Sequence, residues 1–309
     1  MMLYERIITE EETMEALYDL FRRNFPFCVR EQSFARSLLS QNENTVFTEI
    51  DDSGRLIGAA VLEQNTLLML CVDREYRNRG IGSRLLEAAE KAVRQAGYDS
   101  LVIGAGAHYL MPGVPTVHPV IDEHLEPDAV YNGLEDYTAF FIKRGYIHSW
   151  GCNCFDMRRD LGDYAVSLFH TEGITYRWAV PEDMDAVTAC TDDAHESFTK
   201  YYKNPDMYHE GSAKRVLLAC CGEDAAGVLI VSFAAEGPGL GSVGCTAVRH
   251  KYQGRKIASN LVMLGTQKLQ EAGMEKAFLG YTYTGLDRMY GFAGYKICVY
   301  YFMAVKKLT

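Results

Sequence analysis

The sequence VDREYRNRGIGSRLL occupies residues 72–86 and sets the organisation of the first half of the chain. Before it, residues 67–72 are apolar without polar alternation, which predicts a strand covered on both faces. After it, apolar residues recur at helical intervals as far as Val93, which predicts an amphipathic helix. A strand therefore runs into a helix through a short basic loop with two glycines.

This loop has the features of an anion-binding site. Gly80 and Gly82 let the backbone come close to a ligand and adopt positive φ. The free N–H groups of the first helical turn and the helix dipole favour a phosphate there, and Arg77, Arg79 and Arg84 add positive charge. The loop lacks the Lys-Ser/Thr end of a nucleotide P-loop and the later glycine of a dinucleotide fingerprint, so ATP and NAD are disfavoured.

The pattern Arg-x-x-Gly-x-Gly at residues 77–82 resembles the pyrophosphate loop of the GNAT acyltransferase superfamily. The resemblance implies that acetyl-CoA, or another acyl-CoA, is the co-substrate, with its pyrophosphate on residues 79–84 and its pantetheine along the preceding strand. The cofactor contacts that it implies in this half of the chain are Cys71, Val72, Arg77, Asn78, Arg79, Gly80, Ile81, Gly82, Ser83 and Arg84.

A second landmark of the superfamily, Tyr-x-x-x-Gly-Phe/Tyr, occurs twice. Residues 141–146 carry it in the first half, with Phe141 at the position of the usual general-acid tyrosine, and residues 290–295 carry it complete in the second half. The loop recurs as well, at residues 253–258. The two loops are offset by 176 residues and the two landmarks by 149, and the difference of 27 falls at the long irregular stretch 104–133. A single insertion thus reconciles two copies of one unit.

We therefore expect an α/β fold with two tandem GNAT-like domains at residues 1–159 and 173–309, joined by a linker at 160–172. The order of predicted elements in each copy is that of a GNAT fold, which implies a mostly antiparallel mixed sheet flanked by helices. The cofactor contacts implied in the second copy are Ala247, Val248, Gln253, Gly254, Arg255, Lys256, Ile257 and Ala258.

The two copies differ where the chemistry is expected. Acyl transfer needs an uncharged amine, a polarised carbonyl and a proton donor for the departing thiolate. In the superfamily's usual account, a backbone N–H of the central strand polarises the carbonyl and the tyrosine donates the proton. The second copy has this tyrosine as Tyr290, but Lys256 replaces a loop glycine. A lysine costs strain at positive φ, although its ammonium group near the pyrophosphate would compensate.

The first copy has the better loop and lacks the tyrosine. Tyr137, one turn before Phe141 on a helix expected at 135–144, is the candidate substitute. Our first hypothesis places the chemistry in the C-terminal half at Tyr290, with an N-terminal half that binds CoA without turnover or shapes the cleft. A mirrored hypothesis places it in the N-terminal half, with Tyr137 or water as the acid and Phe141 as a packing residue.

The long insertion contains His108 and Tyr109, which are candidates for substrate contacts. Loops of this length are uncommon and usually functional, so the insertion is expected to form a wall or lid of the substrate pocket. The alternative is a structural cover between the two halves of the protein.

Composition narrows the class of protein. The chain has 309 residues, of which 48% are hydrophobic, enough for one large or two medium cores. Its net charge of −10 argues against nucleic acid as a partner. The acidic N-terminus does not resemble a signal peptide, and no segment reaches the roughly 18 apolar residues of a membrane span, so a cytoplasmic protein without a membrane partner is expected. The nine cysteines are expected as reduced thiols rather than metal ligands, because they lack the paired spacing of a zinc site.

The resulting functional hypothesis is an N-acetyltransferase that moves an acetyl group from acetyl-CoA to an amine of a small molecule or peptide. The alternative is a non-catalytic protein that binds acyl-CoA or holds a partner, both copies being degenerate. The acceptor, the general base, the catalytic copy and the oligomeric state stay open at this point.

Overall fold

The computed structural model describes residues 4–7, 11–28, 32–41, 44–104, 110–121, 134–233 and 239–308. Contacts divide the chain into two compact units. Unit 1 comprises residues 1–154 together with 299–309, and unit 2 comprises residues 155–298.

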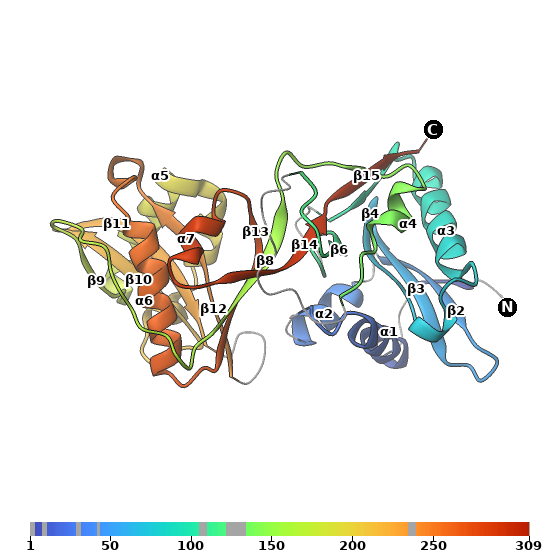
Figure 1. Cartoon of the computed structure of the whole chain (residues 1–309), viewed down its shortest axis with the longest axis horizontal. Coiled ribbons are helices and arrows are strands. Elements are labelled where there is room, and N and C mark those ends of the chain that lie inside the picture. Colours follow the sequence, from blue (N-terminus) through green and yellow to red (C-terminus); the bar gives the residue numbers. More distant parts are fainter. Residues whose placement is uncertain are drawn as a thin grey trace. The chain divides into compact units, whose positions relative to one another are not determined.

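Unit 1 is a mixed sheet with helices (Figure 1). Its strands follow the order β1-β2-β3-β4-β5-β15-β7. All described neighbours in this sheet are antiparallel except β4 and β5, which are parallel. The elements are β1 (Tyr4–Ile7), α1 (Glu11–Asn24), α2 (Gln32–Leu39), β2 (Asn44–Ile50), β3 (Leu56–Glu63), β4 (Thr66–Val72), η1 (Arg74–Tyr76), α3 (Ile81–Gln95), β5 (Ser100–Ile103), β6 (Val114–Thr116), α4 (Thr138–Ile142), β7 (Ile147–His148) and β15 (Ala304–Lys307).

Unit 2 repeats this plan. The second sheet follows the order β6-β14-β8-β13-β12-β11-β10-β9, and the pair β12 and β13 is parallel, as β4 and β5 are in unit 1. Strand β6 pairs with residues 300–302 at the end of β14, which belong to unit 1, whereas β14 begins in unit 2. The elements are β8 (Cys154–Asp160), β9 (Thr175–Trp178), η2 (Pro181–Asp183), α5 (Met184–Tyr202), η3 (Pro205–Tyr208), β10 (Lys214–Cys221), β11 (Asp224–Ser232), β12 (Leu240–Val248), η4 (His250–Tyr252), α6 (Ile257–Glu271), β13 (Lys276–Tyr283), α7 (Asp287–Gly291) and β14 (Lys296–Phe302). The predicted internal repeat and the mixed α/β class are both confirmed.

The same packing device places the start of the long helix in both units. Helix α3 lies beside β2, β3 and β4 and buries Leu85, Leu86, Ala89 and Val93 (Figure 1). A Cβ atom added to Gly58 in β3 would lie 3.0 Å from the side chain of Ile81, the first residue of α3. A Cβ atom on Gly227 in β11 would lie 3.2 Å from Ile257, the first residue of α6. Glycine at these two strand positions therefore lets each helix begin close against its sheet.

The last strand of each sequence copy belongs to the sheet of the other unit. Strand β8 ends the first copy in the sequence, yet it lies between β13 and β14 in unit 2. Strand β15 ends the second copy, yet it lies between β5 and β7 in unit 1, where it pairs antiparallel with both. The proposed boundaries 1–159, 160–172 and 173–309 describe the order of the copies in the sequence and stay a prediction.

Two further features concern the chain as a whole. Each of the nine cysteines is a thiol outside any disulfide, as expected. None of the helices in the described part of the chain combines the length and the apolar character needed to cross a bilayer.

Candidate functional site

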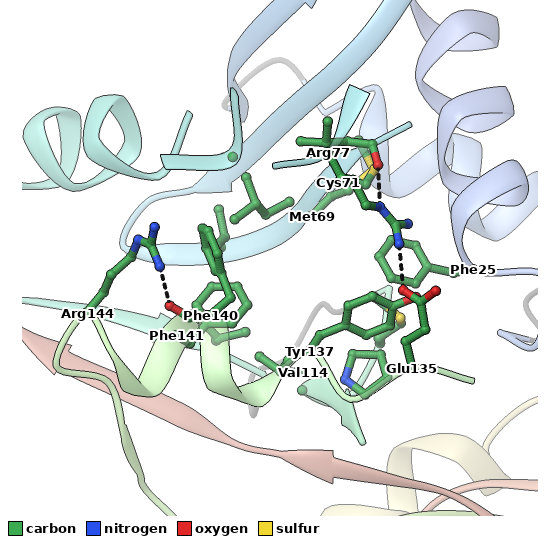
Figure 2. A pocket seen from close by; sticks show the side chains of 18 of the residues that line it. Phe25, Met69, Cys71, Arg77, Val114, Glu135, Tyr137, Phe140, Phe141 and Arg144 are labelled. Atoms are coloured by element: carbon green, nitrogen blue, oxygen red, sulfur yellow. Dashed lines mark hydrogen bonds and ion pairs between the residues drawn. The ribbon is translucent and has the colours of Figure 1, made fainter. Parts of the chain in front are cut away.

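Unit 1 contains a cavity of about 570 Å³ beside the part of β4 that extends beyond its pairing with β5 (Figure 2). The two strands pair only at Thr66–Val102 and Leu67–Ile103. Within the described residues, β4 from Leu68 to Val72 has no strand partner on its β5 side, and this stretch lines the cavity. On that side the Val72 carbonyl accepts from Arg77 Nε, and the other backbone groups have no strand partner within the described residues. They can therefore bind an extended ligand, as the edge of a sheet binds an added strand.

The predicted phosphate loop borders the same cavity. Of the contacts expected in the first copy, the cavity lining includes Cys71, Val72, Arg77, Asn78, Gly80, Gly82 and Ser83, whereas Arg79, Ile81 and Arg84 are not part of it. Gly80 caps α3 with a φ of 78°, in the left-handed region that glycine tolerates without strain. Gly80 therefore has the predicted backbone role, whereas the positive φ predicted for Gly82 is wrong, because Gly82 lies inside α3.

The arginines of the loop already have partners in the protein. Arg77 Nη1 donates to Glu135 Oε2 at 2.8 Å, and its Nε donates to the carbonyl of Val72 at 3.0 Å. Arg84 Nε donates at 2.9 Å to Glu49, whose side chain is only 1% exposed. Arg79 lies over the ring of its neighbour Tyr76, at 5.2 Å from the ring centroid. The positive charge expected from these three side chains is therefore offset at Arg77 and Arg84, because each is ion-paired to a carboxylate distant in sequence.

The segment before α4 forms the opposite wall. Tyr137 lines the cavity, with its ring 5.5 Å from the Arg77 guanidinium and edge-to-face with Phe25 at 6.1 Å (Figure 2). Helix α4 spans Thr138–Ile142, so the helix expected at 135–144 is shorter and Tyr137 precedes it. Phe141 is 7% exposed and packs edge-to-face on Phe140 and Tyr146.

Three polar residues at this wall escaped the sequence-based prediction. Glu135, Asp136 and Arg144 all line the cavity. Arg144 lies within the second landmark at 141–146, and Glu135 and Asp136 lie a few residues before it. That landmark was the available signal, but it served only to locate the tyrosine position.

Cys71 on β4 is a buried thiol that faces the same cavity. Burial raises the pKa of this thiol well above its usual value, and the nearby carboxylate of Asp73 raises it further. The group is therefore a neutral thiol near pH 7.

The second loop, residues 253–258, is contacted by the chain's own segment from Phe169 to Glu172. The side-chain amide of Asn260 on α6 donates to the Phe169 carbonyl and accepts from the Phe169 N–H, both at 2.9 Å. Arg255 Nη2 donates to the carbonyl of Glu172 at 2.5 Å. Two backbone positions of this segment are thus bound at the start of the helix where the resemblance implies a pyrophosphate.

Lys256 has a strained backbone conformation, and its ammonium group contacts two aromatic rings. It caps α6 with a φ of 63°, in the left-handed region, where a lysine costs strain. Its ammonium group lies over the rings of Phe169 and Phe292, at 5.3 and 4.9 Å from their centroids. Gln253 Nε2 donates to the Val248 carbonyl at 3.1 Å and so repeats the contact of Arg77 with Val72.

The remaining expected residues of unit 2 are largely enclosed. Tyr290 on α7 is 4% exposed and packs edge-to-face on Tyr295 at 6.0 Å. Burial raises the pKa of Tyr290 to about 12. Ala247, Val248 and Ile257 are buried, and Gly254 has a φ of 78°.

Two further points concern the predicted substrate contacts and metal ligands. His108 and Tyr109 fall outside the residues that the structure describes. Among the described residues, no group of three or more His, Cys, Asp or Glu side chains is placed to hold a metal ion.

Comparison with known proteins gives a consistent result. The model of the acetyltransferase (GNAT) family matches residues 14–110 and, separately, 176–294. No curated protein matches the chain in sequence.

Solved structures of similar fold span the whole chain. A GCN5-related N-acetyltransferase from Sphaerobacter thermophilus is 18% identical with a TM-score of 0.67, covering 99% of this chain and 96% of that one. A tandem GNAT protein from the clavulanic acid biosynthesis pathway is 15% identical with a TM-score of 0.65, covering 100% and 98%. A glucosamine N-acetyltransferase region of a fungal multi-domain β-N-acetylglucosaminidase is 17% identical with a TM-score of 0.71, and the match spans 98% of this chain but only 38% of that one. At these identities the likeness concerns the fold alone.

Proposed function

Because the chain belongs to the acetyltransferase (GNAT) family, whose model matches two separate regions of it, we propose that it is an acetyl-CoA-dependent N-acetyltransferase. It transfers the acetyl group to an amine of a small molecule or peptide. The observation that carries the proposal is the cavity of unit 1, where the unpaired side of β4 leads to the glycine-capped start of α3.

The residues present fit acetyl-CoA in this cavity. The free backbone groups of β4 suit the amides of a pantetheine arm, and the N–H groups at the start of α3 suit a pyrophosphate. Val72, Asn78, Gly80, Gly82 and Ser83 line the cavity between these two features. We assign the cofactor to this copy.

The contacts of the second loop favour the same assignment. Phe169 and Glu172 are hydrogen-bonded to Asn260 and Arg255, and the Lys256 ammonium lies over two aromatic rings. A pyrophosphate at that loop would have to displace these contacts. This supports the mirrored hypothesis, in which the N-terminal copy does the chemistry.

In the proposed reaction, the neutral amine nitrogen attacks the thioester carbonyl carbon, the C–S bond breaks, and the sulfur leaves with a proton from the general acid. The nitrogen loses one proton to solvent, and solvent returns a proton to the acid. A backbone N–H of β4 polarises the carbonyl, and we assign the proton donation to Tyr137, since it is the tyrosine that lines the cavity close to β4. Glu135 and Asp136 place two carboxylates at the same wall, which suits an acceptor that arrives as a cation.

The decisive experiment mixes the purified protein with acetyl-CoA and a panel of primary amines, and follows the free thiol of CoA. Amine-dependent CoA release is the expected result. Tight binding of acetyl-CoA without release on any acceptor would favour the alternative, a non-catalytic acyl-CoA-binding protein. The absence of any binding would refute both.

A further inference from the structure

Arg144 is a cavity-lining cation that no carboxylate neutralises among the described residues. The other arginine that lines the cavity, Arg77, is ion-paired with Glu135 at 2.8 Å. Arg84, also expected to hold phosphate, is paired with the buried Glu49 at 2.9 Å. The positive charge available to an anion inside this cavity therefore comes from Arg144, which lies outside the phosphate loop in the sequence.

The Arg144 guanidinium is held in one place. Its Nη1 donates to the carbonyl of Phe140 and its Nη2 donates to Ser83 Oγ, both at 2.7 Å. Its carbon lies 3.8 Å from the centroid of the Phe140 ring, which is a close stacking contact. Since the guanidinium has five N–H donors, these two bonds fix its orientation and leave donors for a ligand.

Arg144 also lies beside the start of α3. Ser83 is the third residue of that helix, and a Cβ atom on Gly82 would lie 3.5 Å from the ring of Phe140. The lack of a side chain at Gly82 thus leaves the Phe140 ring, with Arg144 on it, next to the first turn. Figure 2 shows Arg144 at one end of the group of labelled side chains and Tyr137, Glu135 and Arg77 at the other. The cavity therefore has a cationic end and an end with the candidate proton donor.

We propose that Arg144 binds the pyrophosphate of CoA and so acts as a second phosphate-binding element beside the loop. The inference rests on the proposed function, because it takes acetyl-CoA as the ligand of this cavity. Arginine binds phosphate through several parallel N–H bonds, and a guanidinium already fixed by Phe140 and Ser83 loses little freedom on binding. The corresponding position of the second copy is Ala293, which has no charge.

The test compares three ligands on Arg144→Met, measured by calorimetry. For acetyl-CoA the expected result is binding weaker by about ten- to hundredfold, the usual effect of losing charge-assisted hydrogen bonds. Dephospho-CoA, which keeps the pyrophosphate and lacks the 3′-phosphate, should show the same loss. S-acetylpantetheine, which has no phosphate, should bind the variant and the wild type equally.

Matched variants separate a direct contact from a structural one. Lys143→Met removes a neighbouring exposed charge that does not line the cavity, so acetyl-CoA affinity should stay close to wild type. Arg144→Lys keeps the charge and should lose less affinity than Arg144→Met. Each variant is checked by thermal unfolding.

Three outcomes would overturn the inference: unchanged acetyl-CoA affinity in Arg144→Met, an equal loss for S-acetylpantetheine, or a loss confined to ligands with the 3′-phosphate. A wild-type protein that binds no acetyl-CoA would instead refute the proposed function, so the two failures are distinguishable.

Discussion

Tyr137 and Phe141 divide the roles that a single tyrosine has in the superfamily pattern. Phe141 is buried against Phe140 and Tyr146, whereas Tyr137 lines the cavity. We expect Tyr137→Phe to lower kcat by about a hundredfold with little effect on KM, because general acid catalysis contributes that much to a proton transfer. Steady-state kinetics with the best amine of the panel measure this.

Tyr290→Phe is the matched control, since Tyr290 is the tyrosine of the other copy. It should leave kcat close to wild type. The opposite pattern, a large loss in Tyr290→Phe and none in Tyr137→Phe, would return the chemistry to the C-terminal half and support the first sequence-based hypothesis.

The position of Cys71 in the cavity lining raises a different mechanism, in which the acetyl group would first be transferred to the Cys71 thiol. Burial first, and the Asp73 carboxylate second, raise the pKa of this thiol, so almost none of it is thiolate at neutral pH. Cys71→Ala should therefore retain transfer activity, and mass spectrometry of the wild type after incubation with acetyl-CoA alone should find no acetylated protein. Acetylation at Cys71, together with an inactive alanine variant, would establish a thioester route.

At the level of single residues, the sequence predicted backbone behaviour better than side-chain partners. The glycine pattern correctly placed Gly80 in the left-handed region, because that conformation depends on local sterics. The pattern could not foresee that Arg77 and Arg84 are paired with Glu135 and Glu49, since those carboxylates are brought close by the tertiary fold.

At the level of elements, the two phosphate loops have the same backbone plan and different surroundings. Both follow a short 3₁₀ turn and both begin a helix of 15 residues with a left-handed cap. The first borders the cavity, whereas the second is contacted by Phe169 and Glu172. We therefore expect one acetyl-CoA bound per chain, measured by calorimetric stoichiometry or native mass spectrometry.

Substitutions at two glycines that have the same backbone angle test which loop binds the single acetyl-CoA. Gly80 and Gly254 both have a φ of 78°, so valine at either position costs about 1–2 kcal/mol of stability through the same strain. Gly80→Val should abolish acetyl-CoA binding, while Gly254→Val should bind one equivalent with wild-type affinity. Two equivalents in the wild type, or a loss of binding in Gly254→Val, would contradict the assignment.

The long helices were predictable and the short elements were less so. Helices α3 and α6 follow from strong local patterns of apolar residues. Helix α4 is only five residues long, and glutamate and tyrosine at 135 and 137 are outside it. The local signal for that boundary is Asp136, whose carboxylate accepts from the backbone N–H of Thr138 at 2.8 Å. A contact from another element adds to it, since the backbone N–H of Tyr137 is bound by the carbonyl of Pro115.

At the level of the whole molecule, the sequence revealed two copies but not how they complete their sheets. Strands β8 and β15 occupy the same place in the order of their copies. The sequence repeat therefore predicts an equivalent last strand in each copy, without indicating which sheet that strand joins. Which sheet each one joins depends on partners far away in the chain, as β15 shows by pairing with β5 about 200 residues earlier. Patterns within a short stretch of sequence do not indicate such long-range strand pairing.

The exchange of these strands predicts a single unfolding transition. Unit 1 needs residues 299–309 from the second predicted copy, and unit 2 needs residues 155–160 at the end of the first, so neither unit is formed by one copy alone. The protein has two tryptophans, Trp150 in unit 1 and Trp178 in unit 2. Urea unfolding of Trp150→Phe and Trp178→Phe, followed by fluorescence, should report the transition of each unit through its remaining tryptophan.

In each variant the fluorescence midpoint should match the midpoint from circular dichroism, which monitors the whole chain. The wild type monitored by both signals is the control for the effect of each substitution. A fluorescence transition that clearly precedes or follows the circular dichroism transition would show that the units unfold independently.

The residues that close the first sheet come last in the chain. Leu308 is 7% exposed in the core cluster of unit 1, and its N–H donates to the carbonyl of Asp99 at 2.7 Å. Disruption of residues 304–308 would therefore harm the N-terminal cofactor cavity rather than the copy that precedes them in the sequence.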